Sequence, residues 1–550
     1  MAYVITQNCC NDATCVPVCP TNCIHPTPDE PGYGTAEMLY IDPDGCIDCG
    51  ACLDVCPVKA IEPDFDLSPH AMPFLELNAQ YYRDPANQGY DPNPAPRRPR
   101  TTDWPDEGPL RVAIVGSGPA ACYVAEHLLD QRGLDVRIDV LERLPVPWGL
   151  VRFGVAPDHQ NTKLVTEEFT RTLRNPKVRL LLDVEVGTTV SHEDLVARYH
   201  AVVYAVGAMG DRRLDIPGED LPGSHSATEF VAWYNGHPDF ADRRFDLSGE
   251  RAVIIGNGNV ALDVARVLLS DVDELRRTDI ADHALEQLSR SNVREVVVVG
   301  RRGPAQAAFT IPELVGLTQA TAFGVEVVPA EVVLDDATRD WGEGRSESIP
   351  LHKASTLAEL GAASTDDAKR AVLRFGWSPT EVLGDSHVEG VRLVRNDLAL
   401  MDGAVVARPG DHIEEISTGL VLRSVGYRGN PVPGLPFEPG RAVVPNEGGR
   451  VETGVYAAGW FKRGPSGVIG TNKHCAEETV AALLEDWTSG RLGAPVKDDD
   501  LIALVGAHLD LAAWGRIDRH ERSEGKASSR PRVKLVARAD LLAAAADVAV

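Results

Sequence analysis

The chain has 550 residues, of which 54 are basic and 81 are acidic, and its formal net charge at pH 7 is −27. This length predicts three or four domains, and the acidic balance argues against nucleic acids or anionic membranes as partners. No stretch of about 18 uninterrupted apolar residues is present, and the first residues lack the pattern of a signal peptide. We therefore expect a cytoplasmic protein that does not bind a membrane.

Nine of the eleven cysteines lie before residue 57, which favours cluster ligation over disulfides in a chain without an export signal. Residues 46–57 form a CxxCxxCxxxCP run, typical of bacterial ferredoxins, and residues 9–20 repeat it with Asp12 in place of the second cysteine. The repeat predicts two iron–sulfur clusters. In such a run the fourth cysteine ligates the other cluster. This rule gives a first cluster site of Cys9, Cys15 and Cys56, and a second, [4Fe–4S] site of Cys19, Cys46, Cys49 and Cys52.

Three thiolates at the first site suit a [3Fe–4S] cluster, and this stretch resembles the seven-iron ferredoxins, including the prolines that follow Cys19 and Cys56. It differs from many of them in having five rather than seven residues between Cys9 and Cys15. Asp12 is therefore either a ligand of a fourth iron or a solvated side chain, and the sequence leaves both open.

Two other cysteines, Cys10 and Cys23, receive no ligand role and are expected to be small buried side chains. A structural zinc site is the alternative for the whole module, although zinc sites do not use this spacing. Residues 1–80 contain twelve acidic residues and one basic residue, Lys59. This charge either forms a docking face for a basic partner or only keeps the module soluble.

A proline-rich segment follows the ferredoxin module, which we place at residues 1–80. Residues 81–107 contain six prolines and the basic cluster Arg97, Arg98 and Arg100. Such a composition cannot build a core and tends to be extended. It predicts a linker that makes electron transfer to the following domain intramolecular.

The next stretch predicts a dinucleotide-binding unit. The apolar run 112–115 reads as a buried parallel strand, and a GxGxxA turn follows it and opens a helix. In this turn Gly116 permits the tight bend, Gly118 lets the backbone approach a pyrophosphate, and Ala121 allows close packing of helix on strand. The second strand ends at Glu142, where an acid can bond a ribose hydroxyl. An adenine dinucleotide is predicted here.

A second unit of the same kind begins at residue 252. A strand over 252–255 leads into the GxGxxA turn 256–261, and the following strand ends in Arg301 and Arg302 instead of an acid. Two guanidiniums offer paired donors to a 2′-phosphate, so the pattern favours NADPH over NADH. An Arg-Arg pair on a solvated turn is the alternative.

The loop over residues 144–163, LPVPWGLVRFGVAPDHQNTK, is not required by either unit. It resembles the adrenodoxin reductase type of NADPH-ferredoxin reductase, and the resemblance covers residues 110–480 together with the RPRVKL stretch near 530. It implies that the first dinucleotide is FAD and that His159 lies near the flavin and Glu313 near the nicotinamide, the two candidate catalytic residues. The other implied FAD neighbours are Leu150, Val186, Trp460, Gly467, Val468 and Ile469. The implied NADPH neighbours are Arg212, Asn257, Gly258, Asn259, Val260, Glu313 and Gly467.

We thus predict an α/β chain with two nested dinucleotide-binding domains after a small α+β ferredoxin domain, an arrangement that resembles the actinobacterial ferredoxin/ferredoxin–NADP reductases. The FAD domain is placed at 108–208 and 432–550, and the NADPH domain at 209–431. The expected reaction passes electrons from NADPH through FAD to the clusters. The expected acceptor beyond them is a free ferredoxin or a redox enzyme such as a monooxygenase.

Two rival functions remain. A glutamate synthase-like electron-input subunit also pairs cysteine clusters with two dinucleotide folds, but it does not explain the loop over 144–163. Alternatively, the ferredoxin module is redox-silent, and its clusters only stabilise the module or bind partners.

Overall fold

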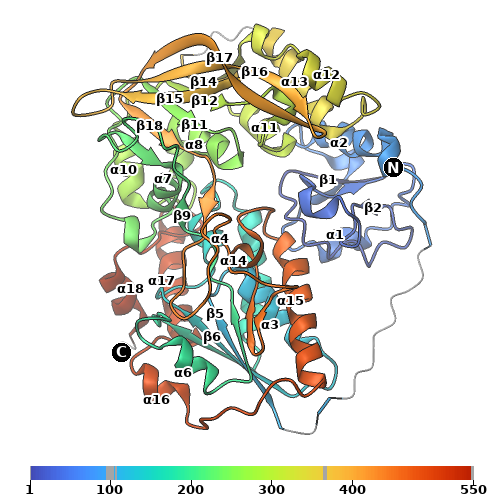
Figure 1. Cartoon of the computed structure of the whole chain (residues 1–550), viewed down its shortest axis with the longest axis vertical. Coiled ribbons are helices and arrows are strands. Elements are labelled where there is room, and N and C mark those ends of the chain that lie inside the picture. Colours follow the sequence, from blue (N-terminus) through green and yellow to red (C-terminus); the bar gives the residue numbers. More distant parts are fainter. Residues whose placement is uncertain (1, 94–103, 106–107, 363–367, 547–550) are drawn as a thin grey trace.

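The computed structural model describes residues 2–93, 104–105, 108–362 and 368–546, which form three connected bodies (Figure 1). The N-terminal body pairs β1 (Tyr3–Ile5) with β4 (Ile61–Pro63) and β2 (Ile24–His25) with β3 (Tyr40–Ile41), all antiparallel. Its helices are α1 (Ala51–Val55) and α2 (Met72–Arg83). Because β4 pairs with β1, the start and the end of the cysteine-rich region lie together.

The predicted linker at 81–107 begins too early. Helix α2 runs across the proposed limit at residue 80, and Tyr81 stacks on Tyr40 with ring centroids 4.3 Å apart. The hydroxyl of Tyr82 also donates to the carbonyl oxygens of Cys23 and Tyr40. These aromatic side chains belong to the first module because they bury large apolar surfaces there. The basic cluster at residues 97–100 lies outside the described residues.

The second body contains a six-stranded sheet in the order β20-β21-β8-β5-β6-β7, parallel except for the edge strand β20. Its inner strands are apolar and buried because helices cover both faces. The strands are β5 (Leu110–Val115), β6 (Val136–Glu142), β7 (Val178–Leu182), β8 (Ala201–Tyr204), β20 (Arg450–Glu452) and β21 (Val455–Ala457). The helices are α3 (Pro119–Leu129), α4 (Leu150–Phe153), α5 (Val165–Leu173), α6 (His192–Val196), α14 (Trp460–Arg463), α15 (Thr471–Thr488), α16 (Leu501–Val505), α17 (Leu511–Ala527) and α18 (Arg538–Ala545).

The third body contains a six-stranded parallel sheet in the order β10-β18-β11-β12-β14-β13, and a three-stranded antiparallel sheet β15-β16-β17 at the top of Figure 1. The strands are β10 (Ser224–Ser226), β11 (Arg251–Ile255), β12 (Glu295–Gly300), β13 (Gly324–Val327), β14 (Arg370–Phe375), β15 (Trp377–Leu383), β16 (Gly390–Met401), β17 (Ala404–Ser417) and β18 (Leu420–Arg423). The helices are α7 (Ala227–Tyr234), α8 (Asn259–Leu269), α9 (Val272–Leu275), α10 (Asp282–Leu288), α11 (Ile311–Thr318), α12 (Asp336–Trp341) and α13 (Ile349–Ala362). Short 3-10 helices complete the chain: η1 (Tyr33–Thr35), η2 (Asp64–Asp66), η3 (Pro85–Asn87), η4 (Thr162–Leu164), η5 (Pro238–Phe240), η6 (Pro304–Gln306) and η7 (Pro329–Glu331).

The chain crosses from the second body to the third and later returns, so two segments connect the two large sheets. The two crossings pair with each other as β9 (Gly210–Asp211) and β19 (Tyr427–Arg428), close to the predicted domain limits. The third body is therefore inserted into the second. No helix among the described residues has the length and apolarity needed to span a membrane.

The first module packs on both other bodies. Ile311, at the start of α11, is buried among the core side chains of the module. On its other side, Cys10, Val58 and Ala60 are buried in the same cluster as Ala120 of α3. Figure 1 shows the blue module beside the upper and lower bodies. Its position is fixed by packing, and not by the linker alone.

Candidate functional site

The first glycine turn connects β5 to α3. Gly116 has φ of +105°, and a Cβ there would lie 2.4 Å from the carbonyl oxygen of Ala205, so no side chain fits. Gly118 precedes the first residue of α3, and it faces Gly149 of the 144–163 loop. A Cβ on Gly149 would lie 3.2 Å from the Cα of Gly118. The backbones of these two glycines are thus in direct contact beside a helix N-terminus, where unpaired N–H groups can bind a pyrophosphate. Ala121 is buried where α3 packs on the sheet.

Glu142, at the end of β6, points back to this turn. Its carboxylate accepts hydrogen bonds from the backbone N–H and hydroxyl of Ser117 and from the N–H of Leu144. Burial raises the pKa of Glu142 despite these bonds. The acid therefore lies beside the turn, as a ribose-binding residue requires.

The predicted flavin neighbours come from three segments. Leu150 begins α4 directly after Gly149, and Val186 packs beside the edge of the sheet. Trp460 begins α14 directly after Gly459, whose φ is +70°. The remaining neighbours, Gly467, Val468 and Ile469, form the turn before α15, where the N–H of Val468 donates to the hydroxyl of Thr471.

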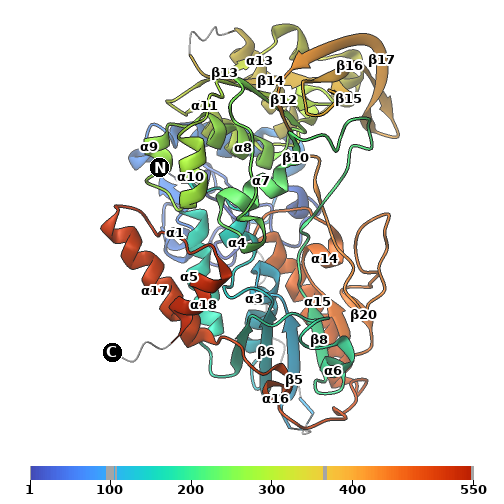
Figure 2. The same cartoon turned by 90° about the vertical axis from the view of Figure 1, so that its left-hand side faces the viewer.

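Helices α15 and α3 lie side by side in both views of the molecule (Figure 1 and Figure 2). A Cβ on Gly459 would lie 2.6 Å from that of Ala120 in the first turn of α3 and 3.3 Å from the side chain of Asn472 in the first turn of α15, so the N-termini of the two helices lie close together. Both helix N-termini consequently supply positive potential to one region, which is the arrangement that an anionic flavin and its pyrophosphate need.

The second glycine turn connects β11 to α8 in the third body. Gly256 has φ of +111°, and a Cβ there would lie 2.1 Å from the carbonyl oxygen of Ser424. The side chain of Asn257 lies against Gly300, at the end of β12. A Cβ on Gly258, in contrast, would meet no described atom within 4 Å, so open space lies in front of this turn. Asn259 and Val260 form the first turn of α8, with the Asn259 side chain accepting from Thr310 N–H.

Arg301 and Arg302 follow β12 at the edge of this open space. Arg301 is exposed and Arg302 half-buried, and burial and the charge of Arg301 lower the pKa of Arg302. Neither guanidinium forms an ion pair within the described part of the chain. Arg212, the third predicted cation, is exposed, and its backbone N–H donates to the carbonyl oxygen of Gly426 beside the paired strands β9 and β19. These unpaired charges fit a phosphate ligand.

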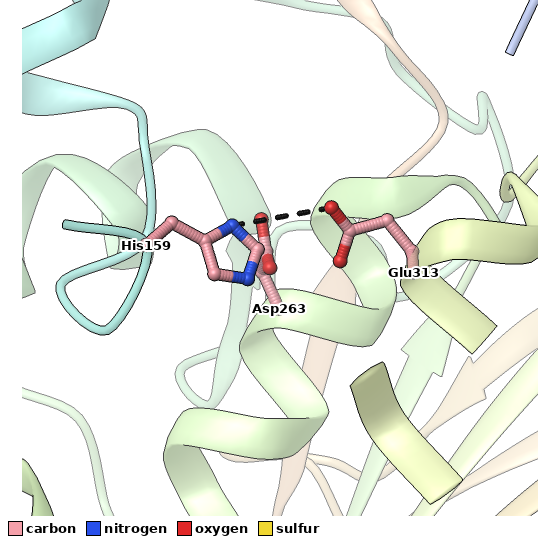
Figure 3. Close-up of side chains that lie close together, drawn as sticks. All are labelled: His159, Asp263 and Glu313. Carbon is pink, nitrogen blue, oxygen red and sulfur yellow. Dashed lines mark ion pairs between the residues drawn. The ribbon is translucent and has the colours of Figure 1, made fainter. Parts of the chain in front are cut away.

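The two candidate catalytic residues come from different bodies and meet between them (Figure 3). Nδ1 of His159 lies 3.9 Å from a carboxylate oxygen of Glu313, which belongs to α11. Arg266 of α8 places Nη2 at 2.8 Å from Nε2 of His159 and bonds the carboxylates of Asp158 and Asp263. His159, Asp263 and Glu313 are close enough to hold a metal ion, but the Arg266 guanidinium already compensates their charge.

The pKa of Glu313 is shifted toward neutral pH by its surroundings. Burial, followed by the charge of Asp263, raises the pKa of Glu313 to about 7. Its Oε2 and Nη1 of Arg266, 3.6 Å apart, are buried without a hydrogen-bond partner in the described chain. An acceptor and a donor side by side fit a carboxamide, the polar group of nicotinamide.

Sequence reasoning missed Arg266, Asp263 and Asp158. A signal existed, because Asp263 and Arg266 are charged residues one turn apart in a helix that is otherwise almost wholly apolar and buried. In sequence alone such a pair is indistinguishable from a helix-stabilising ion pair.

The second cluster site is a cavity within the first module. The four predicted ligands, Cys19, Cys46, Cys49 and Cys52, all line it. Cys23, to which the sequence assigned no role, also lines the cavity, and its sulfur lies 3.4 Å from that of Cys19. A hydrogen bond from Cys23 lowers the pKa of Cys19. Four thiols around one cavity fit a [4Fe–4S] cluster.

The first cluster site is more deeply enclosed. Burial raises the pKa of Cys9 to about 12, and burial, followed by the charges of Cys9, Asp12 and Cys56, also raises the pKa of Cys15. Such thiols ionise only when a cationic group binds them, which fits iron. Asp12 is half-buried and accepts a hydrogen bond from the Thr14 hydroxyl, so it is not simply solvated.

Comparison with known proteins agrees with this geometry. A family model described as 4Fe-4S dicluster domain matches residues 8–60, and one described as pyridine nucleotide-disulphide oxidoreductase matches residues 110–302. A probable ferredoxin/ferredoxin–NADP reductase of Mycobacterium tuberculosis is 50% identical over 99% of this chain and 95% of its own length. The chain belongs to the ferredoxin/ferredoxin–NADP reductase family.

Relatives without the first module match the remainder. The NADPH-ferredoxin reductase FprA of Mycobacterium tuberculosis is 46% identical over 79% of this chain and 98% of its own. The mitochondrial NADPH:adrenodoxin oxidoreductase of Arabidopsis thaliana is 39% identical over 80% of this chain and 96% of its own. A solved structure of FprA in complex with NADPH superposes with a TM-score of 0.75, covering 80% of this chain and 99% of FprA.

Membership of the ferredoxin/ferredoxin–NADP reductase family confirms the predicted fold class and enzyme class, an α/β flavoprotein oxidoreductase preceded by a ferredoxin domain. It also confirms the predicted reaction, electron transfer from NADPH through FAD to iron–sulfur centres. The glutamate synthase-like alternative is therefore set aside. The roles of individual site residues stay predictions.

Proposed function

We propose that this ferredoxin–NADP reductase passes the electrons of NADPH through FAD into the two clusters of its own first module, of which the first is a [3Fe–4S] cluster. The observation that carries the proposal is the docking of that module. The N–H of Gly470, immediately before α15, donates a 2.6 Å hydrogen bond to the carbonyl oxygen of Cys10, next to the ligand Cys9. The ligand loop thus touches the turn that is predicted to border the flavin.

In this scheme NADPH loses a hydride and becomes NADP⁺, which releases two electrons and one proton in total. FAD accepts the electron pair and can release the electrons one at a time, as single-electron centres require. The chain binds the 2′-phosphate with Arg301 and Arg302 and orients the nicotinamide with Glu313. His159, held at Nε2 by Arg266, keeps its Nδ1 directed toward Glu313 and the space between the two domains.

A [3Fe–4S] cluster is supported by the three thiols of the first site. The sulfur ligands are Cys9, Cys15 and Cys56, and the Asp12 carboxylate is engaged by Thr14. An acid held by its own neighbour is a poor fourth ligand. Electron paramagnetic resonance of the oxidised protein tests this assignment, because a [3Fe–4S] cluster is paramagnetic when oxidised and a [4Fe–4S] cluster of the ferredoxin type is not.

Anaerobic stopped-flow mixing with NADPH tests the function. We expect the flavin absorbance at long wavelength to bleach first and the broad cluster absorbance to follow. Reduced flavin with permanently oxidised clusters would show that the first module is redox-silent and would refute the proposal.

A further inference from the structure

The two cluster sites are not equivalent with respect to the rest of the chain. The segment around the first site, including Cys10, Val58 and Ala60, is buried against α3 and α15 of the FAD domain. Cys9 and Cys56, two of its ligands, pack against the same cluster as Ile469. The second site is lined by residues 3 to 52 only, so no described part of the reductase contacts it.

The contact at the first site is made by two backbones. A Cβ on Gly470 would lie 2.1 Å from backbone atoms of Asn11 and Asp12, so only glycine permits this approach. Nearby, the Tyr123 hydroxyl of α3 is buried without a partner among the described residues, and burial, followed by the charges of Cys10 and Asp12, raises its pKa. The close backbone contact and the exclusion of water favour rapid electron transfer between the FAD domain and the first cluster site.

The second site reaches the surface on a different part of the module. Ile47 is 61% exposed and Leu53 is 39% exposed, although both are apolar, and the ligand Cys49 lies between them in sequence and is exposed as well. The acids Asp44 and Asp54 are exposed on either side of this segment. We call these five residues the exit face.

We propose that the clusters work in a fixed order, in which the first receives each electron from the flavin side and the second delivers it through the exit face. The proposal rests on the proposed function. Each NADPH supplies two electrons, which leave one at a time and reduce two molecules of a one-electron acceptor, while one proton is released. The apolar centre and acidic rim of the face fit a redox protein whose own electron-entry site is apolar and ringed by basic residues.

The order is tested by rapid freeze-quench electron paramagnetic resonance of the intact holoprotein mixed with NADPH. We expect the signal of the oxidised first cluster to disappear before the signal of the reduced second cluster appears. Appearance of the second signal while the first cluster is still oxidised would overturn the order. If neither cluster changes while the flavin is reduced, the proposed function itself fails.

A variant distinguishes an obligatory order of electron transfer from a simple difference in reduction potential between the two clusters. Cys15→Ala should remove the first cluster, and the second cluster must then still be reducible by dithionite. We expect NADPH to reduce its flavin but to leave the second cluster at least tenfold slower to reduce than in the parent protein. Reduction at the parent rate would refute the relay. If the variant loses both clusters, the freeze-quench order in the parent protein decides.

The exit face is tested with two heme proteins, cytochrome c, whose heme edge has a basic rim, and cytochrome b5, whose rim is acidic. We expect Asp44→Lys combined with Asp54→Lys to lower kcat/KM for cytochrome c about tenfold at low salt and to raise it for cytochrome b5. The control, Asp385→Lys with Asp411→Lys, makes the same change in net charge at exposed acids of the NADPH domain. Equal effects of the two double variants would show that only net charge matters and would overturn the exit face.

Discussion

A carboxylate oxygen of Glu37, in the ferredoxin module, accepts a 2.6 Å hydrogen bond from the backbone N–H of Ile311 at the start of α11. Its other oxygen lies 2.6 Å from Nζ of Lys353, a buried lysine of the NADPH domain. Helix α11 carries Glu313 two residues later. The module is therefore anchored to the helix that presents the candidate nicotinamide-binding acid.

The Glu37 contact predicts a large effect on stability. Among the described residues, Glu37→Ala leaves the buried Lys353 ammonium without a carboxylate and with the carbonyl oxygens of Ala307 and Phe309 as acceptors, and we expect the free energy of unfolding to fall by about 3 kcal/mol. Urea denaturation measures this change. Glu76→Ala is the control, because its ion pair with Arg83 is exposed and should contribute less than about 1 kcal/mol. Equal losses in the two variants would contradict a buried anchor.

The arginines after β12 predict cofactor preference. Replacing Arg301 and Arg302 together with Ala removes the unpaired donors at the second glycine turn, and we expect KM for NADPH to rise about 30-fold with little change for NADH, since each charged hydrogen bond is worth about 1.5–3 kcal/mol. Steady-state kinetics with both cofactors measure the ratio. Arg277→Ala, at an exposed arginine of the same domain, should leave the ratio unchanged. An unaltered preference in the double variant would refute the assignment.

Glu313 predicts a pH-dependent preference for the oxidised cofactor. Because burial and Asp263 raise its pKa to about 7, the acid is largely neutral at pH 6 and largely ionised at pH 8. The carboxylate attracts the cationic ring of NADP⁺ but not the neutral ring of NADPH. We expect the ratio of Kd for NADPH to Kd for NADP⁺ to rise about fivefold between these pH values.

Because NADPH itself reduces the flavin, titrations monitored by flavin absorbance measure this ratio with NADP⁺ and with a neutral-ring analogue of NADPH that cannot donate a hydride. Both cofactors carry the same 2′-phosphate, so ionisation of that phosphate cancels. In Glu313→Gln the ratio should be independent of pH, and a slope that survives in this variant would assign the ionisation to another group.

Asp279 predicts how the two nucleotide-binding domains are held together. This buried acid of the NADPH domain lies 2.6 Å from Nζ of Lys163 and 3.2 Å from Nζ of Lys534, both from the FAD domain. Asp279→Ala removes the carboxylate shared by two enclosed ammonium groups and leaves Lys534 with the neutral acceptors Arg152 O and Asn235 Oδ1, so we expect a loss of about 3–5 kcal/mol in the free energy of unfolding. Thermal or urea denaturation measures it. Asp273→Ala, which removes an exposed ion pair with Arg276, should cost less than about 1 kcal/mol.

The sequence pattern was sufficient to predict those parts of the sites that are built from recurring motifs. The spacing of Cys46, Cys49 and Cys52 places their sulfurs around one cavity, and the rule that the fourth cysteine of a run ligates the other cluster adds Cys19 to them. The glycine turns were equally predictable, since a strand, a tight bend and a helix N-terminus are contiguous in sequence. Pattern failed where packing decides, as at Tyr81, which reads as linker and is buried.

The sequence by itself determined the two glycine turns and the grouping of Cys19, Cys46, Cys49 and Cys52, because both follow from the spacing of residues in recurring motifs. The ligands of the first cluster and the phosphate-binding role of the arginines after β12 stay predictions. Only the tertiary structure decided that Arg266 joins His159 to Glu313, that Glu37 anchors α11, and that the first cluster site faces Gly470. These relationships join residues 47 to 460 positions apart, and side-chain spacing along a chain carries no information about which distant surfaces will exclude water together.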